Sequence, residues 1–367
     1  MPTVFEQSLQ FFLAPIQDLL DDESVSEVMI NGPDTIYVER AGKIQPVPNK
    51  FQGHDALFAC ARNVAQFSGK RVEPTTPRFD ARLPDGSRVH VVLPPVARDG
   101  VSIAIRKFSI STITLDKLIE WGSLNEESVE LLRLAVILGK NIVVSGGTGS
   151  GKTALLNALS GAIPSGERIL VMEDTSELQL QQEHVVRLEA RAADRYGRGQ
   201  VTIRDLLHSA LRLRPDRVIV GECRGGEALD MIQAMNTGHD GSMTTVHANS
   251  PIDALSRVET LALMSGVEIP LVPLRAQVAS AVDLIVQPDR LPDGSRKVTA
   301  IADVMPLDEH GRYVVAPLMR FEHEGRDKKT GAIRGAHKLT GTEPRFWGEV
   351  KAKGLTEHAT ALKGAFS

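Results

Sequence analysis

The sequence predicts an α/β protein in which a C-terminal domain with a mainly parallel sheet follows a smaller α+β N-terminal domain. The chain has 367 residues, more than one compact domain usually holds. From about residue 125 onward, short apolar strands alternate with helical segments, as in parallel sheets covered on both faces. Before residue 109, strand-like runs adjoin turn signals instead. We therefore expect the first domain at 1–108, a linker at 109–122, and the second domain with a C-terminal extension at 123–367.

The first domain is predicted to pack helices on an antiparallel sheet. Apolar residues at helical spacing indicate helices at 4–20 and 54–67. Asp85-Gly86 separates two strand-like runs and is a strong hairpin signal, and Ala41-Gly42 joins another pair. The expected strands are 25–30, 35–40, 43–48, 78–84, 87–95 and 101–108.

The second domain is predicted from strands that are short, apolar and rich in Ile and Val, as doubly buried strands are. Its expected strands are 141–145, 168–173, 217–222 and 242–247. Its expected helices are 125–139, 152–162, 202–213, 226–237 and 251–264. Three further strands are expected at 283–288, 297–304 and 313–321, then a loop at 322–342 and a short helix after Pro344.

Composition makes several classes of protein improbable. The formal net charge is -4 and aromatic residues make up 4%, which disfavours a dedicated nucleic-acid binder. The two cysteines form no C-x-x-C pair, so a cysteine zinc site is excluded and a reducing cytosol is indicated. The N-terminus lacks the basic region of a signal peptide, and no run of about 18 apolar residues occurs. Contact with a membrane is therefore expected only through a protein partner.

A glycine-rich loop carries the strongest functional signal. The stretch SGGTGSGKT fits the P-loop spacing, Gly146-x-x-x-x-Gly151-Lys152-Thr153, between a predicted strand and a predicted helix. Its backbone N–H groups and the helix N-terminus would hold the phosphates of ATP. We expect Lys152 to reach the β- and γ-phosphates and Thr153 to bind Mg²⁺. The predicted nucleotide-binding residues are Gly146, Gly147, Thr148, Gly149, Ser150, Gly151, Lys152 and Thr153.

Acidic residues end two neighbouring predicted strands, at the sheet edge where ligands bind. RILVMEDTSE places Glu173 and Asp174 at one strand end, and RVIVGE places Glu222 at another. We assign the attacking water to Glu222 and Mg²⁺ to Glu173. Asp216 precedes its strand and would lie at the far edge, so we reject it as a metal ligand.

The stretch TGHDGSMTTVHANSP holds two histidines and admits several interpretations. A zinc site is disfavoured because His239 and His247 have no third ligand near them. A Ser-His-Asp triad is disfavoured because no G-x-S-x-G is present. If 242–247 is a strand of the parallel sheet, its carboxyl end places His247 at the same edge of the sheet as Glu222. There His247 would sense the γ-phosphate. The alternative is a structural histidine that caps the helix at 251–264.

Five arginines occur in the segment 187–204. Such runs are usually solvated surface, but a guanidinium group is also suited to pairing with phosphate. From the residues alone, both interpretations stay open for each of these arginines.

Taken together, GGTGSGKT, ILVMEDTSELQL and RLRPDRVIVGECRGGEALDMIQAMNTGHDGSMTTVHANSP resemble the type II/type IV secretion ATPase superfamily, and most closely its Tad (Flp) pilus assembly branch. The resemblance covers roughly 4–345 and is dense from 141 to 263. It makes Gly146 to Thr153 the Walker A motif, Glu222 the Walker B acid, and His247 the end of the His box. The acids of its Asp box are Glu173, Asp174 and Glu177.

The resemblance implies a RecA-like P-loop ATPase domain in a homohexameric cytoplasmic motor, with nucleotide lying between the two domains. Hydrolysis would drive an inner-membrane platform protein, to which the motor is peripherally bound, in pilus assembly or secretion. It also implies that Arg88, Arg106, Arg187 and Arg191 close on the phosphates. The main alternative is a RecA-like nucleic-acid-dependent motor. A small-molecule kinase, an ABC-type ATPase and a non-catalytic nucleotide-binding scaffold fit less well.

Overall fold

The computed structural model describes residues 4–40, 42–72, 75–107, 113–194, 196–355 and 362. The chain forms two compact units, Met1–Ser111 and Thr112–Ser367, which are described separately below. Among the residues that the structure describes, none of the helices combines the length and the hydropathy needed to span a bilayer.

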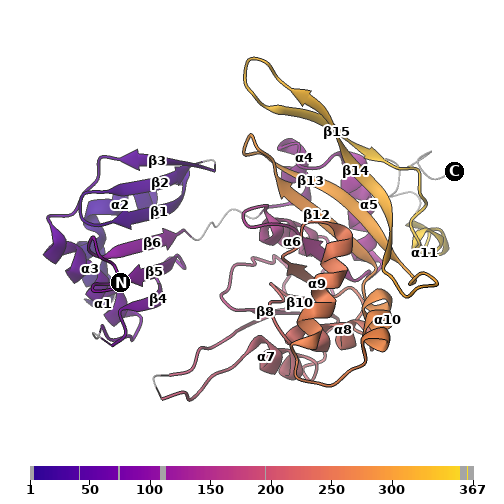
Figure 1. Cartoon of the computed structure of the whole chain (residues 1–367), viewed down its shortest axis with the longest axis horizontal. Coiled ribbons are helices and arrows are strands. Elements are labelled where there is room, and N and C mark those ends of the chain that lie inside the picture. Colours follow the sequence, from indigo (N-terminus) through magenta and orange to yellow (C-terminus); the bar gives the residue numbers. More distant parts are fainter. Residues whose placement is uncertain are drawn as a thin grey trace. The chain divides into compact units, whose positions relative to one another are not determined.

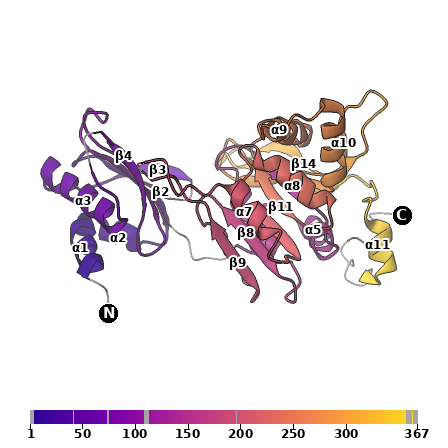
Figure 2. The ribbon, with the colours of Figure 1, turned by 90° about the horizontal axis from the view of Figure 1, so that it is seen from below.

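The first unit is an antiparallel sheet with helices on one face (Figure 2). Its helices are α1 (Val4–Leu13), η1 (Ala14–Ile16), α2 (Gln17–Asp21) and α3 (His54–Phe67). Its strands are β1 (Val25–Asn31), β2 (Ile36–Arg40), β3 (Lys43–Val47), β4 (Arg78–Arg82), β5 (Arg88–Val92) and β6 (Ser102–Arg106), in the spatial order β3-β2-β1-β6-β5-β4. Alternate side chains such as Val28, Ile30 and Val38 are buried against the helices. The predicted helix at 4–20 is broken at Pro15, which is the second residue of a separate 3-10 turn.

The second unit is built on a nine-stranded sheet in the order β15-β14-β13-β12-β7-β11-β10-β8-β9 (Figure 1). The six strands from β12 to β9 in this order run parallel, and β13, β14 and β15 continue antiparallel at the other side. Their bounds are β7 (Ile142–Ser145), β8 (Ile169–Glu173), β9 (Val185–Glu189), β10 (Arg217–Val220), β11 (Met243–Val246), β12 (Leu284–Arg290), β13 (Arg296–Met305), β14 (Val314–Arg326) and β15 (Ile333–Leu339).

Two hydrophobic layers cover the two faces of this sheet. On β7, Ile142 and Val144 face one layer and Val143 faces the other, as the alternation of a strand requires. The first layer takes residues from α4 (Leu115–Glu120), α5 (Glu126–Ile137), α6 (Lys152–Ser160) and α11 (Trp347–Ala352). The second takes residues from α7 (Ile203–Ala210), α8 (Glu227–Asn236), α9 (Pro251–Leu263) and α10 (Leu271–Ala281). Strands β7, β8, β10 and β11 are therefore buried on both faces, which explains their mostly apolar sequences, whereas β9 at the edge of the sheet is only partly buried.

In the second unit and the segment before it, the structure differs from the sequence-based expectation in four places. The expected loop at 322–342 is instead the end of β14 and all of β15, joined as an antiparallel hairpin. This hairpin continues past the core, so its polar side chains carry no hydrophobic pattern to predict it. Strand β9 and helix α10 were not expected, and the expected linker at 109–122 contains α4, whose Leu115 and Leu118 are buried. The rest of that linker includes residues outside the described ranges.

Candidate active site

The phosphate loop joins the end of β7 to the start of α6, at the carboxyl edge of the parallel strands. Gly149 and Gly151 have φ of 72° and 96°, which side-chain-bearing residues rarely adopt. At Gly146 a Cβ atom would lie 2.4 Å from the Pro288 carbonyl oxygen and 2.6 Å from Ser150 Oγ. Glycine is therefore required for both the curl of the loop and its close approach to β12.

Lys152 is folded back onto the phosphate loop. Its Nζ donates to the carbonyl oxygens of Gly146 at 3.0 Å and of Gly147 at 2.9 Å, and lies 3.4 Å from His247 Nδ1. Burial lowers the pKa of Lys152, and the charge of Glu222 opposes that shift. Thr153 follows Lys152 as the second residue of α6. The ammonium group is thus held at the mouth of the loop, beside the groups that end β10 and β11.

Glu222, His247 and Arg224 form a connected set at this edge. Glu222 Oε1 lies 2.6 Å from His247 Nε2, and its Oε2 accepts from Arg224 Nε at 2.8 Å. Burial lowers the pKa of His247, as does the nearby Lys152 charge, so the imidazole is neutral near pH 7. Because Nδ1 faces the ammonium of Lys152, Nδ1 accepts and the proton belongs on Nε2, where it faces Glu222.

The acidic stretch after β8 lies at the same edge but is tied to its own loop. Glu173 is buried, and its Oε1 accepts the backbone N–H groups of Glu177 at 2.9 Å and Leu178 at 3.0 Å. Burial raises the pKa of Glu173, against these hydrogen bonds. A Cβ on Gly221 would lie 2.9 Å from Glu173 Cγ, so the glycine before Glu222 makes room for this carboxylate. Asp174 Oδ2 lies 3.5 Å from Arg224 Nη1, which links the two acidic stretches.

Two of the predicted phosphate-binding arginines, Arg187 and Arg191, make other contacts within the second unit. Arg187 on β9 donates from Nη2 to the Leu180 carbonyl at 2.9 Å. The Arg191 backbone pairs with Val201, and its guanidinium lies against Gly199. Arg88 and Arg106 belong to the first unit, where they are directly paired across β5 and β6.

Two other arginines, which sequence reasoning missed, contact the site. Arg224 stands two residues after Glu222 within GECRGGE, so its nearness in sequence could have predicted a contact with the site. Arg296, the first residue of β13, donates from Nε to the Gly149 carbonyl at 2.9 Å. It lies 147 positions from that glycine, and no motif marked it.

His239 and Asp240 lie in the turn between α8 and β11, at the opposite end of the sheet from the phosphate loop. The His239 carbonyl accepts from Ser242 Oγ at 2.7 Å. A Cβ on the adjoining Gly241 would lie 1.6 Å from Nη1 of Arg217, a buried residue that pairs with Glu167. The HDG part of the stretch is therefore structural, and only its His247 end reaches the site.

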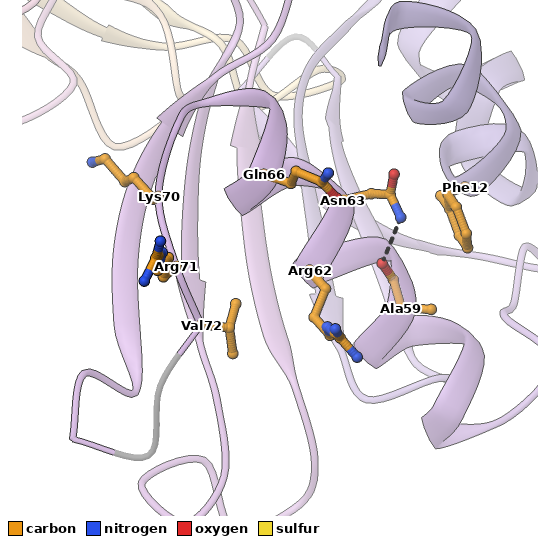
Figure 3. Close-up of a pocket in the computed structure, with 8 residues that line it drawn as sticks. All are labelled: Phe12, Ala59, Arg62, Asn63, Gln66, Lys70, Arg71 and Val72. Atoms are coloured by element: carbon orange, nitrogen blue, oxygen red, sulfur yellow. Dashed lines mark hydrogen bonds between the residues drawn. The ribbon is translucent and has the colours of Figure 1, made fainter. Parts of the chain in front are cut away.

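The first unit contains a hollow whose lining differs from the residues at the phosphate loop (Figure 3). It is lined by one face of α3, by Phe12 of α1, and by the chain after α3. Gly69, with φ of 67°, turns the chain back so that Lys70 N–H bonds to the Ala65 carbonyl. Lys70 and Arg71 thus follow a helix C-terminus, where positive charge is favourable. That position accounts for the charge of the hollow, and we assign it no ligand.

The fold and the site together define a P-loop ATPase. Residues 11–311 match the model of the type II/IV secretion system protein family. The type IV secretion system protein VirB11 of Bartonella quintana is 34% identical, over 79% of this chain and 91% of its own length. The putative conjugal transfer protein Rv3659c of Mycobacterium tuberculosis is 35% identical, over 78% of this chain and 83% of its own. The chain therefore belongs to the type II/IV secretion system protein family, as an ATPase of the secretion and pilus motor class.

Solved structures agree in fold. The Legionella pneumophila ATPase DotB has a TM-score of 0.56 at 19% identity, covering 84% of this chain and 80% of its own. The pilus retraction motor PilT with bound ADP has a TM-score of 0.52 at 18% identity, covering 95% of this chain and 88% of its own. These likenesses support the predicted fold class, an N-terminal α+β domain followed by an α/β ATPase domain.

Proposed function

We propose that this chain is the subunit of a homohexameric, ATP-hydrolysing motor that powers assembly of a Tad (Flp) type IV pilus, or protein secretion. The motor would work in the cytoplasm and bind the inner membrane peripherally, through a platform protein. The observation that carries the catalytic part of the proposal is the contact of Glu222 with His247, beside Lys152 at the phosphate loop.

Hydrolysis follows from these groups. Water attacks the γ-phosphorus in line, the bond to the β-phosphate oxygen breaks, and ATP and water give ADP and phosphate. Glu222 orients the water and takes its proton. Lys152 leaves the carbonyls of Gly146 and Gly147 for the phosphate oxygens, where its charge offsets the negative charge of the transferring group. The neutral imidazole of His247, whose Nε2 faces Glu222, would sense whether the γ-phosphate is present.

Magnesium fits the oxygen groups at this edge. Among the described residues, no three His, Cys, Asp or Glu side chains converge on a metal position. That agrees with Mg²⁺, which is usually held by one or two protein oxygens, substrate phosphates and water. We propose Thr153 and Glu173 as the protein ligands, with Glu173 acting through water because its Oε1 already accepts two N–H groups. When bound, the ion supplies positive charge to the β- and γ-phosphates.

The four remaining arginines would reach the nucleotide through movement of the chain or from a neighbouring subunit. Arg88 and Arg106 would approach the nucleotide when the first unit closes on it. Arg187 and Arg191 would approach it from within the second unit or from a neighbouring subunit. A guanidinium group pairs with phosphate in a planar fork, so each arginine is suited to this task.

The experiment introduces variants of this chain into a strain from which it has been deleted. The number of surface pili and the amount of secreted protein are then measured. We expect the wild type and Lys328→Ala, a control in the turn before β15, to restore the count, and Lys152→Ala to fail. Purified chain should gain the mass of six subunits with a non-hydrolysable ATP analogue. Unchanged pili and secretion in the deletion strain, together with ATP turnover that rises on DNA addition and falls steeply with salt, would favour the nucleic-acid motor instead.

A further inference from the structure

Three carbonyl groups of the phosphate loop are held by positively charged side chains. Lys152 Nζ donates to the carbonyls of Gly146 and Gly147, and Arg296 Nε donates to that of Gly149 at 2.9 Å. A loop that offers its N–H groups to an anion must turn its carbonyls elsewhere, since a carbonyl oxygen facing phosphate would repel it. These cations therefore hold the loop in the form that accepts an anion.

Arg296 reaches the loop from a rigid hairpin. It begins β13 directly opposite Arg290, the last residue of β12. In the turn between them, Asp293 accepts Ser295 N–H at 3.0 Å and Ile333 N–H at 2.6 Å, so the turn is anchored to β15. Arg290 lies beside the loop too, because a Cβ on Gly149 would be 3.8 Å from its Nη1. The hairpin thus brings two guanidinium groups to the outer side of the phosphate loop.

The two kinds of cation differ in what happens when nucleotide binds. Lys152 would have to release the carbonyls of Gly146 and Gly147 to reach the phosphates, whereas the hydrogen bond from Arg296 to Gly149 need not break. We infer that Arg296 is a positioning residue that keeps the Gly149 carbonyl turned outward while nucleotide is bound, with Arg290 adding positive charge beside it. This inference rests on the proposed function, because it assumes that the loop binds the phosphates of ATP.

The test compares purified full-length variants in ADP binding by calorimetry and in steady-state ATP hydrolysis. We expect Arg296→Ala to weaken ADP binding roughly tenfold, as loss of a hydrogen bond from a charged group does. KM for ATP should rise more than kcat falls, and the melting temperature without nucleotide should stay at the wild-type value. Arg296→Lys, which can still donate to the carbonyl, should recover most of the lost affinity. Arg320→Ala, the same change at an exposed position of β14 that is paired with Ala300 and Lys338, should bind ADP as the wild type does.

Lys152→Ala separates the two ideas. If it binds ADP as tightly as the wild type, the phosphate loop is not the nucleotide site and the proposed function fails. If Lys152→Ala loses ADP binding but Arg296→Ala binds ADP as tightly as the wild type, the loop binds nucleotide and the positioning role of Arg296 is wrong. A lowered melting temperature in Arg296→Ala, without recovery of affinity by Arg296→Lys, would also overturn the inference, because it indicates a purely structural role.

Discussion

His247 Nε2 lies 2.6 Å from Glu222 Oε1, although the two residues follow different strands of the parallel sheet, β11 and β10. The same imidazole places Nδ1 3.4 Å from the Lys152 ammonium. One neutral side chain therefore connects Lys152, which is proposed to bind phosphate, to Glu222, which is proposed to hold the water. The helix-capping alternative for His247 has a better candidate, because Ser250 is the N-cap of α9 and its hydroxyl accepts Asp253 N–H.

Replacing His247 with alanine should slow hydrolysis without unfolding the chain. The change removes the polar contact between the imidazole and the Glu222 carboxylate, so we expect turnover to fall roughly tenfold or more. The His247 side chain is 43% exposed, so the melting temperature should change little. Steady-state kinetics and thermal unfolding measure the two effects. A collapse of the melting temperature would instead support a structural histidine.

Glu222→Gln should separate binding from hydrolysis. The amide keeps the size of the side chain and removes its ability to take a proton, so turnover should fall by about two orders of magnitude or more. ADP and ATP affinities should stay within a few-fold of the wild type, because Lys152 and the loop are unchanged. Binding by calorimetry and phosphate release test this. Turnover near the wild-type rate would exclude Glu222 as the base.

Arg224→Ala should lower turnover with little change in ADP affinity. Arg224 fixes Glu222 Oε2 by a hydrogen bond at 2.8 Å, and its Nη1 lies 3.5 Å from Asp174. Without it the Glu222 carboxylate can rotate, so we expect a loss of roughly tenfold. Arg212→Ala, on the segment after α7, is the control. Equal turnover in both variants would show that Arg224 does not orient Glu222.

Asp303→Asn should change how stability depends on pH. Burial raises the pKa of Asp303 to about 6, with Asp283 adding repulsion and the Arg345 N–H opposing it. A raised acid pKa means that the folded state binds a proton more tightly than the unfolded state. The contribution of Asp303 to the free energy of unfolding is therefore fully present at low pH and is lost as the pH rises through about 6.

Urea unfolding at pH 4.5 and at pH 7.5 measures this effect. Relative to the wild type, Asp303→Asn should gain roughly 2 kcal/mol between these two pH values. Its amide oxygen can still accept the Arg345 N–H group. Asp308→Asn is the control, because hydrogen bonding chiefly from the Arg312 N–H lowers the pKa of Asp308 and gives the opposite sign. A parallel pH dependence in wild type and Asp303→Asn would contradict the expectation.

Much of the second unit was predictable because local sequence carries its signal. The P-loop spacing, the glycines with positive φ, and the apolar runs of β7, β8, β10 and β11 each specify their own conformation. The position of Glu222 and His247 at one edge also follows, because parallel strands share a carboxyl edge. By contrast, β15 and the end of β14 are polar, and their pairing is decided by a neighbouring strand rather than by their own pattern.

The sequence by itself predicted the phosphate loop and the acid and histidine that lie beside it, since these predictions depend on short spacings within single elements. Only the tertiary structure decided which cations meet them. Arg187 and Arg191, close in sequence to the acids, bond elsewhere, whereas Arg296 reaches Gly149 from 147 positions away. The reason is physical, because strand order sets which side chains share an edge. In this sheet β12 lies beside β7, although 138 residues stand between Ser145, the last residue of β7, and Leu284, the first residue of β12.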